Sequence, residues 1–573
     1  MNTKITPWAF VSLLLCSCAA KQQPVDSPSS PTFSWDKATV YFLITDRFCN
    51  GDSTNDIQYG RCVDYGSERL NAATFHGGDY AGIIQKAKEG YFTQLGIDAV
   101  WLTDPYEQIH GWVPGSGWVH NEFPHFGYHG YYPLDYTQMD KNYGTIEEYR
   151  TLINLLHSQG IRVMSGANIN DCGYPTFLDA IQQGYATVPG ITTEAEAIKH
   201  NKEIDYNAWL ASLYDSPEWF TRQWLREPAE SSDFFKTTLY GLPDYLSEKT
   251  EPVDIPLFLQ KKWQREGNEN DAWTWPAMKA LRQASPVSPC EQVIRFIAAW
   301  VEEFGLDGFR CDVVQYVEPE RWGQLHRACN EALTRWRKNH PEDPASKWTD
   351  EVMFTGDYED AFITRIPSLE KQGFGSMVNM MFPKDGNLDN IIGVWQQYAD
   401  SMQTWQGKPW YPFSYLNNAY FRETSADNAE ACATTFLLSP GAIQIFYGDE
   451  VNRPMTDAIN NVDRAQAFRS DYRWDLPNPE LLSHYQRLGQ FRQRHAAVGK
   501  GCQQQLDAKT VLRTYLHDNV VISLEPQVGE PIPVGTLVGK LRNAYTGEVV
   551  EVTDGHIILT QPSGQVALIE PLI

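Results

Sequence analysis

Short runs of β-branched and aromatic residues recur along this chain, and stretches with helical periodicity separate them. The helical stretches lie near residues 83–95 and 146–158, and the short runs at residues 40–44, 99–103, 161–164, 308–312, 352–357, 413–417 and 442–446. Strands that alternate with helices predict a parallel sheet, because a parallel connection needs a crossover. The number of runs suits an α/β fold, the closed (β/α)8 or TIM barrel, whose functional site lies at the carboxyl ends of the strands.

The N-terminus is similar to an export signal. Lys4 precedes an apolar run at residues 8–15, which is too short to span a bilayer. The run ends in Leu15-Cys16-Ser17-Cys18 and resembles a bacterial lipoprotein signal in which Cys18 becomes the acylated first residue. A plain cleaved secretory signal is the alternative. No Asp directly follows Cys18, so we expect an exported outer-membrane lipoprotein that meets the membrane through its lipid anchor only.

Two regions interrupt the alternation of strands and helices. The segment after the third strand is long, irregular and aromatic, which indicates an inserted domain. From residue 501 short strands alternate with turn residues, which predicts a small antiparallel β domain. The 573 residues therefore divide into a lipoprotein signal (1–18), a flexible tether (19–34), the barrel (35–169 and 277–500), the inserted domain (170–276) and the C-terminal β domain (501–573).

The charge of the chain excludes one class of partner. A net charge of −25 repels phosphates, so nucleic acid is not expected as a ligand. Export permits disulfides, and Cys49 and Cys62 flank a polar loop and form the best candidate pair. Cys311 lies within an apolar strand and is expected to be a buried free thiol. No CxxC spacing indicates zinc.

The strand Gly308-Phe-Arg-Cys-Asp312 carries the first candidate site residues. Arg310 and Asp312 lie on the same face, because strand side chains alternate. The arginine stabilises the ionised aspartate by charge and hydrogen bonding, as a nucleophile in sugar transfer requires. A purely structural ion pair is the alternative.

Five segments in this order resemble glycoside hydrolase family 13, the α-amylase family, and within it the periplasmic α-amylases of enteric bacteria. They are Thr45-Asp-Arg-Phe48, Tyr128-His-Gly-Tyr-Tyr-Pro-Leu-Asp135, Leu242-Pro-Asp244, Gly308-Phe-Arg-Cys-Asp312 and Phe446-Tyr-Gly-Asp-Glu450. The resemblance implies α-1,4-glucans such as starch and maltodextrin as ligands, and a retaining mechanism in which one carboxylate attacks and a carboxylic acid protonates the leaving oxygen. It makes Asp312 the nucleophile and Arg310 its orienting cation.

The chain departs from this family at the other two carboxylates. The general acid follows a Thr-Gly-Glu pattern in the family, and here Phe354-Thr-Gly-Asp357 puts a shorter Asp in its place. Retaining chemistry needs carboxyl groups about 5 Å apart, and a misplacement of about 1 Å can cost roughly a hundredfold in rate. The third carboxylate belongs to a His-Asp pair, which is replaced by Ala419 and Tyr420. Tyrosine is neutral at neutral pH, and its ring would fill part of the sugar site.

Two further motifs differ from the family pattern. Gly166 replaces the Asp at the end of the third strand, and Asp171 replaces the His that follows it. The Lys-His pair after the nucleophile strand, which binds substrate in the family, is Gln315-Tyr316. These changes at the sugar-binding centre predict impaired hydrolysis.

Other family positions are retained. His129 and Tyr131 match residues that contact and stack on the sugar. Asn170 and Asp244 match ligands of a structural calcium ion, and their oxygens suit a hard cation. A second oxygen-rich group resembles the N-terminal calcium site of cyclodextrin-forming relatives, with a solvated turn as the alternative; it comprises Asn50, Asp52, Asn55, Asp56, Gly77 and Asp79.

Three hypotheses for function follow from the sequence. The first is an α-glucan-binding protein with little or no hydrolysis. The second is an active retaining hydrolase that uses Asp312 and Asp357. The third is a scaffold that binds another protein and no sugar. We favour impaired chemistry, because function depends on the residues of the site rather than on the fold.

Overall fold

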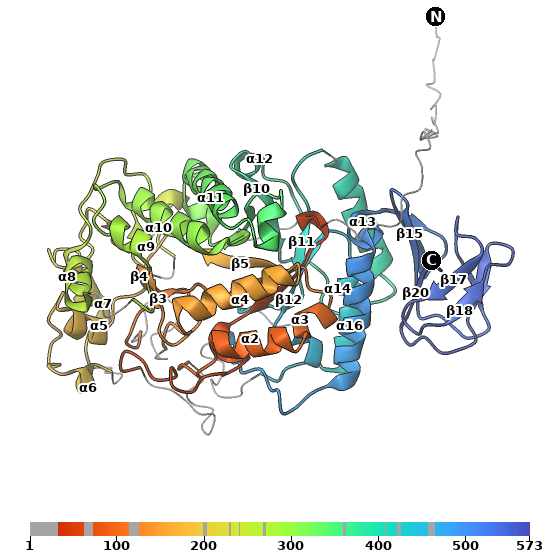
Figure 1. Cartoon of the computed structure of the whole chain (residues 1–573), viewed down its shortest axis with the longest axis horizontal. Coiled ribbons are helices and arrows are strands. Elements are labelled where there is room, and N and C mark those ends of the chain that lie inside the picture. The colour runs from red at the N-terminus through yellow and green to blue at the C-terminus, as the bar shows by residue number, and fades with distance from the viewer. Residues whose placement is uncertain are drawn as a thin grey trace, which may run out of the picture.

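The computed structural model describes residues 33–61, 73–113, 125–198, 203–228, 231–239, 241–267, 271–358, 363–405, 407–420, 424, 426–455 and 464–572. Its centre is a closed parallel barrel (Figure 1). The strands close in the order β1-β12-β11-β10-β9-β8-β5-β2. Their bounds are β1 Thr39–Leu43, β2 Ala99–Leu102, β5 Arg162–Ala167, β8 Gly308–Cys311, β9 Met353–Gly356, β10 Phe374–Asn379, β11 Phe413–Tyr415 and β12 Ala442–Phe446.

The barrel strands are apolar because both of their faces are covered. All five residues of β1 are buried, and the same holds for the four residues of β2. The helices around the barrel are α2 Tyr80–Lys88, α3 Tyr91–Gln94, α4 Ile146–Ser158, α10 Pro289–Phe304, α11 Pro319–Asn339, α12 Pro367–Glu370, α13 Ile391–Thr404, α14 Ala429–Leu437 and α16 Pro479–Arg494.

Local sequence signals begin and end these helices. Thr145 and Glu148 form a reciprocal capping box at the start of α4. Pro289 occupies the first turn of α10, and Gly305 ends that helix in the left-handed region with φ 74°. A Cβ on Gly305 would lie 2.5 Å from the Trp336 ring of α11, so the close packing of the two helices also requires glycine here.

The segment between β5 and α10 forms a separate helical lobe beside the barrel (Figure 1). The hairpin of β3 Tyr106–Gln108 and β4 Pro133–Met139 lies next to it. The elements of the lobe are α5 Phe177–Gln183, α6 Glu194–Ala197, α7 Tyr206–Leu213, β6 Leu225–Arg226, β7 Asp244–Tyr245, α8 Leu257–Glu266 and α9 Pro276–Leu281.

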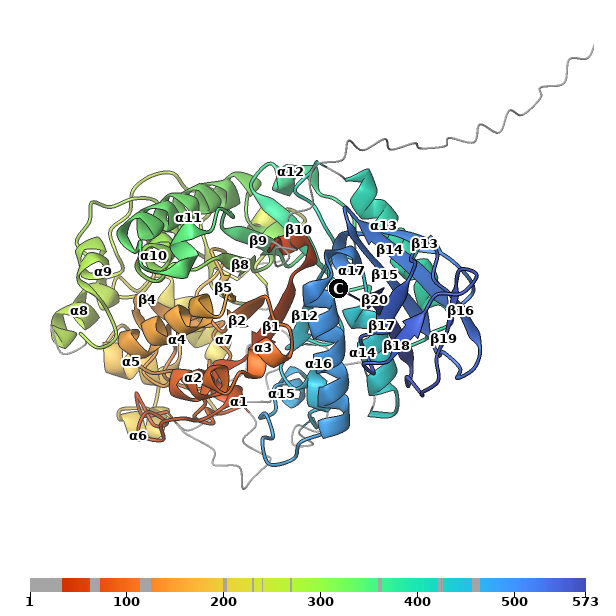
Figure 2. The same ribbon diagram turned by 45° about the vertical axis from the view of Figure 1, so that its right-hand side comes forward.

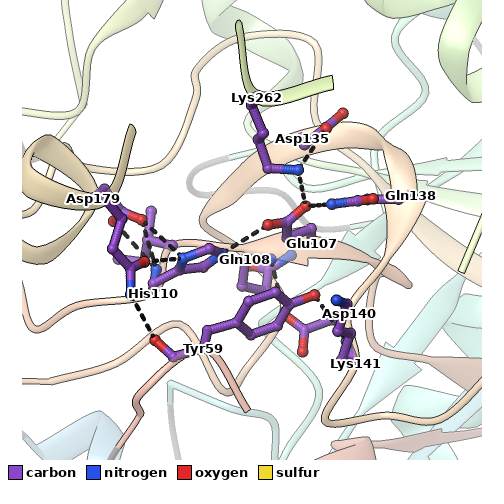
Figure 3. Close-up of polar contacts among 12 residues, drawn as sticks. Tyr59, Glu107, Gln108, His110, Asp135, Gln138, Asp140, Lys141, Asp179 and Lys262 are labelled. Atoms are coloured by element: carbon purple, nitrogen blue, oxygen red, sulfur yellow. Dashed lines mark hydrogen bonds and ion pairs between the residues drawn. The ribbon is translucent and has the colours of Figure 1, made fainter. Parts of the chain in front are cut away.

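A buried ion network ties this lobe to the β3–β4 hairpin (Figure 3). Lys262 of α8 contacts Glu107 at 2.6 Å and Asp135 at 3.1 Å. On the other side of Glu107, His110 lies 2.7 Å away. Burial alone would lower the pKa of Lys262, but the charges of Glu107 and Asp135 outweigh it and raise that pKa above its usual range. These charges are therefore buried where little water reaches them, and each is stabilised by its oppositely charged neighbours.

The C-terminal residues fold into a six-stranded antiparallel sheet at the opposite end of the molecule from the helical lobe (Figure 1). In Figure 2 this sheet lies beside α13 and α17 Ala496–Lys500, which contact its first strands. The strands of the domain are β13 Cys502–Gln505, β14 Thr510–Tyr515, β15 Asp518–Leu524, β16 Pro531–Pro533, β17 Lys540–Asn543, β18 Val549–Glu551, β19 His556–Ile558 and β20 Val566–Pro571.

The sequence predicted seven of the eight barrel strands. Strand β10 was missed because its sequence, Phe374-Gly-Ser-Met-Val-Asn379, places a glycine and a serine inside the apolar run. The single helix predicted at residues 83–95 is wrong: Gly90, with φ 79°, divides α2 from α3. Among the described residues, no helix is both long and apolar enough to cross a bilayer.

Candidate active site

Two neighbouring strand ends, those of β8 and β9, carry the first site residues. The amide of Asp312 donates to the Ala167 carbonyl of β5 at 3.0 Å, and the amide of Asp357 donates to the Cys311 carbonyl of β8 at 2.9 Å. These bonds extend the parallel ladder by one residue beyond each strand. Asp312 and Asp357 are therefore fixed side by side at the carboxyl edge of the barrel, where such barrels place their sites.

Arg310 joins the two aspartates. Its Nη1 donates to Asp312 and its Nη2 donates to Asp357. The three side chains are largely buried, with 8%, 18% and 20% of their surface exposed for Arg310, Asp312 and Asp357. Burial alone would lower the pKa of Arg310, but the charges of the two aspartates raise it above its usual range. One permanent cation is thus shared by two carboxylates, and the three side chains together keep a net negative charge.

A stack of rings covers this ion pair. Tyr131 and Tyr420 stack with centroids 5.9 Å apart, and His129 also stacks on Tyr131, with centroids 4.8 Å apart. Arg469 lies 4.9 Å above the Tyr420 ring and donates through Nε to the Ala419 carbonyl at 3.0 Å. Cation–π contacts of this kind stabilise a ring in place.

The cavity between these groups is small. Its volume is about 20 Å³, and its lining includes Tyr131, Arg310, Asp357, Tyr420 and Trp101. A single water needs roughly 10–15 Å³ on this measure. The cavity accommodates a water molecule and is too small for a sugar ring.

The segment after Asp312 is strained. Val313 has φ 40° and ψ 52°, a left-handed conformation that is unfavourable for a β-branched residue. It leads into a 3-10 turn that carries Gln315 and Tyr316. The Gln315 side-chain oxygen is buried with no hydrogen-bond partner within the described residues, and Tyr316 packs edge-on against the exposed Phe234 at 5.8 Å. Gln315 and Tyr316, two of the four predicted substrate-binding residues, thus lie on the loop that follows the candidate nucleophile.

Two further buried carboxyls, those of Asp104 and Asp171, lie near the carboxyl end of β5. Asp104 follows β2, and its Oδ1 accepts from the Gly166 amide at 2.7 Å. Asp171 accepts from the Asn168 side chain at 2.8 Å. Burial raises the pKa of Asp104 to about 7, and burial together with the charge of Asp312 raises the pKa of Asp171 to about 7. The strand ends therefore hold more acidic groups than Arg310 can neutralise.

Asn170 and Asp244, the first predicted calcium ligands, lie together. The Asn170 carbonyl accepts from the Tyr245 amide at 2.7 Å. Asp244 Oδ2 accepts from Arg226 at 3.3 Å, while its buried Oδ1 has no hydrogen-bond partner within the described residues. Burial and the charge of Asp171 raise the pKa of Asp244 well above its usual range. An oxygen donor without a partner in such a place fits a cation, although Arg226 already supplies part of the positive charge.

Five of the six predicted ligands of the second calcium site also lie together. A Cβ on Gly77 would lie 2.5 Å from Asp56 Oδ1 and 2.6 Å from the Asn50 amide nitrogen. The buried Asn55 side-chain oxygen has no hydrogen-bond partner among the described residues. Asp79 lies beside them, because its Oδ2 accepts from the Asn55 side chain at 3.3 Å, and its carboxylate also caps α2 by accepting from the amides of Gly51, Asp52 and Gly82.

Asp52 is the member of that predicted set whose side chain points elsewhere. Its carboxylate accepts from the amide of Thr54 at 2.9 Å and from the Thr54 hydroxyl at 2.7 Å. Within the described residues, no group of three or more His, Cys, Asp or Glu side chains is arranged to hold a metal ion. The fit of this loop to calcium thus depends on amide and backbone oxygens beside Asp56.

Two site residues were missed by sequence reasoning. Asp104 carried a usable signal, because it directly follows a predicted strand just as Asp312 does. Arg469 carried none, since it lies in an irregular segment far along the chain from Tyr420. Cys18 and Cys62 lie outside the described residues, and Cys311 is buried with a free thiol, as the sequence predicted.

Comparison with known proteins gives the same fold over most of the chain. A family model described as "Alpha amylase, catalytic domain" matches residues 42–363. The periplasmic alpha-amylase of Escherichia coli (strain K12) is 32% identical over 511 residues, which is 83% of this chain and 70% of that protein. A cyclomaltodextrin glucanotransferase from Bacillus sp. (strain 38-2) is 33% identical over 159 residues, 28% of this chain and 21% of that protein.

Solved structures show the same architecture. The alpha-amylase from Geobacillus thermoleovorans, complexed with acarbose, superposes with a TM-score of 0.58 at 17% identity and covers 94% of this chain and 99% of its own. An Anoxybacillus alpha-amylase also gives a TM-score of 0.58 at 17% identity, over 95% of this chain and 100% of its own.

Proposed function

This chain belongs to the alpha-amylase family, and on that premise we propose that it binds α-1,4-glucans such as starch and maltodextrin outside the cytoplasm but hydrolyses them poorly. The ligand class is supported by its relatives, whose names or structures include a periplasmic alpha-amylase and complexes with acarbose and maltose. The impaired chemistry is supported by the residues at the strand ends.

One observation carries the proposal: Arg310 bridges Asp312 and Asp357 beneath the stacked rings of Tyr131 and Tyr420. A general acid must bring a proton to the leaving oxygen, whereas a carboxylate paired with a guanidinium is held as an anion. The ring of Tyr420 occupies the position where the family has its third carboxylate. A sugar ring can reach Asp312 only after Tyr420 moves.

A second function has a specific observation in its favour. Asp312 and Asp357 contact two nitrogens of one guanidinium, so their carboxyl groups are near each other, as a retaining pair must be. On this alternative, substrate displaces Tyr420 and separates Asp357 from Arg310. The protein is then an active retaining hydrolase with Asp312 as nucleophile and Asp357 as acid.

An activity assay separates these functions. We expect the purified protein to release little or no reducing sugar from starch or maltodextrin, with or without calcium. Isothermal titration with maltoheptaose is expected to give heat, and absence of heat would favour a protein-binding scaffold. Robust turnover that Asp312→Asn abolishes would overturn the proposal in favour of the hydrolase. The triple change Asp357→Glu, Ala419→His and Tyr420→Asp is expected to raise turnover if only the chemistry is missing.

Calcium is part of the proposal as a structural ion. Asn170 and Asp244 would hold one ion between barrel and lobe, and Asn50, Asn55, Asp56 and Gly77 would hold another beside α2. The unpartnered oxygens of Asp244 and Asn55 support this assignment. The ion would supply positive charge that offsets the buried carboxylates.

Export is also proposed, because a protein 32% identical to this chain is periplasmic. Acylation of Cys18 would attach the chain to the outer membrane through lipid alone. Metabolic labelling with a radioactive fatty acid tests this: label is expected in the wild type and absent from Cys18→Ser. Equal labelling of the two proteins would exclude Cys18 as the anchor.

A further inference from the structure

Gly166 leaves a gap at the end of β5 that Asp104 fills. A Cβ built on Gly166 would lie 2.2 Å from Asp104 Oδ1 and 2.9 Å from its carboxyl carbon and its Oδ2. Real atoms do not approach so closely, so no side chain fits on residue 166 while Asp104 stays in place. The two residues form a matched pair, with the side chain just beyond the end of β2 and the vacant position on the adjacent β5.

The pairing of the strands places this carboxyl beside the ion pair of the site. Gly166 is directly opposite Arg310 of β8, and the next pair is Ala167 and Cys311. Neighbouring strands lie about 4.8 Å apart, and side chains at paired positions point to the same face. A side chain that lies over Gly166 is therefore the neighbour of Arg310 on the side away from Asp357.

We propose that Asp104 is a positioning residue for Arg310 and Asp312, reaching from the end of β2 across Gly166 to set the charge on that side of the guanidinium. It competes with Asp312 and Asp357 for Arg310. When Asp104 is ionised it attracts Arg310 and repels Asp312, and when it carries a proton it leaves Arg310 to the other two aspartates.

The surroundings of Asp104 allow this change of charge near neutral pH. Asp104 is 4% exposed, and burial raises its pKa to about 7, helped by Asp312 and opposed by the Gly166 amide and Arg310. The charged groups that act on it are Asp312 and Arg310. The other titratable groups around it are tyrosines, which are neutral at this pH: Tyr80, Tyr106, Tyr131, Tyr136, Tyr143 and Tyr149.

The test compares Asp104→Asn with the wild type across pH 5 to 9. The readouts are maltoheptaose affinity and any reducing-sugar release, so this part rests on the proposed function. We expect an inflection near pH 7 in the wild type and a smaller one in Asp104→Asn, where Asp171, whose pKa is also raised to about 7, still lies near Asp312. The matched control is Asp98→Asn at the other end of β2, a buried aspartate bonded to the Thr39 amide at 2.9 Å, which should keep the inflection. The same inflection in Asp104→Asn would overturn the positioning role.

A second measurement does not depend on sugar. Asp104 binds protons between pH 4 and 7 in the folded protein that the unfolded chain has lost, so it makes stability fall as pH rises through that window. As pH rises from 4 to 7, the Tm of Asp104→Asn should therefore increase relative to the Tm of the wild type. In an Asp312→Asn background that gain should shift to lower pH, because the repelling charge is gone.

The sugar measurement and the Tm measurement distinguish the proposed glucan binding from the proposed role of Asp104. A wild type that neither binds nor cleaves maltoheptaose, yet shows the coupled Tm shift, contradicts the proposed function and supports the role of Asp104. A Tm difference unaffected by Asp312→Asn overturns that role whatever the sugar result. The exchange Asp104→Gly with Gly166→Asp supplies the carboxyl from the neighbouring strand instead, and it should restore the part of the inflection that Asp104→Gly alone removes.

Discussion

Tyr420 decides how much space the strand ends leave for a ligand. Its ring stacks on Tyr131 and lies under Arg469, yet 38% of its surface is exposed, so the described residues leave part of the ring open to solvent. A stacked aromatic pair and a cation–π contact together stabilise the ring by about 1–2 kcal/mol. A ligand that offers comparable contacts can therefore displace it.

Truncation of this ring gives the first prediction. We expect Tyr420→Ala to bind maltoheptaose at least about tenfold more tightly, because a difference of about 1.4 kcal/mol in displacing the ring is tenfold in affinity. Tyr420→Phe keeps the stacking and should bind like the wild type. Titration calorimetry on the three proteins measures the effect, and weaker binding by Tyr420→Ala would mean that the ring contacts the glucan instead of excluding it.

His157 gives a prediction about pH. It is fully buried on α4, 3.0 Å from Asp307 and 3.5 Å from Asp343. Burial alone lowers the pKa of His157, but the two aspartates raise it to about 9. A raised pKa means that the folded state holds its proton more tightly, so the stabilisation is complete below about pH 6.5 and is lost between about 6.5 and 9.

His157→Gln should remove that loss. Relative to this variant, the wild type is expected to lose roughly 3 kcal/mol of stability between pH 6.5 and 9.5. The measurement is the difference in Tm between the two proteins across this range. The exposed His517 offers a matched control, and His517→Gln should parallel the wild type. A constant difference between wild type and His157→Gln would show that the imidazole is neutral throughout.

At the scale of elements, the buried ion network makes the β3–β4 hairpin and α8 depend on each other (Figure 3). Lys262→Met leaves Glu107 and Asp135 buried without their cation, and breaking such a pair costs about 3–5 kcal/mol. We expect a large drop in Tm and faster proteolysis of the lobe. The neighbouring Lys261 is 45% exposed, so Lys261→Met should change stability by no more than about 0.5 kcal/mol. Equal effects of the two substitutions would contradict the buried network.

The elements also show where sequence reasoning works and where it stops. Strands such as β1 and β12 were predictable because parallel strands covered on both faces are apolar throughout. Strand β10 was not, since Gly375 and Ser376 interrupt its apolar run. Asp312 and Asp357 were predictable from their place after strands, whereas the contact of Asp104 with Gly166 exists only when β2 and β5 lie side by side. Residues that compensate for each other across strands carry no local pattern.

At the scale of the whole molecule, the proposed calcium ions would stabilise two separate places: one ion would bind beside α2, and the other where the inserted lobe meets β5. Binding to the folded state alone stabilises it by about 2.7 kcal/mol when the ion is at 100 times its dissociation constant. A chelator should therefore lower the Tm of the wild type, and calcium should restore it, more effectively than magnesium, which demands a smaller octahedral site.

Single substitutions measure how much of the calcium-dependent stabilisation comes from each of the two proposed sites. Asp56→Asn should abolish the part due to the loop beside α2, and Asp244→Asn the part due to the junction with the lobe, each leaving the other intact. Asp215→Asn changes a carboxylate that is 74% exposed on the lobe and should respond to calcium like the wild type. The double variant Asp56→Asn with Asp244→Asn should be indifferent to chelator. If its Tm still falls on chelation, the ion binds elsewhere. If the wild type is itself indifferent, Arg226 alone balances Asp244, and the fold of this family member is stable without calcium.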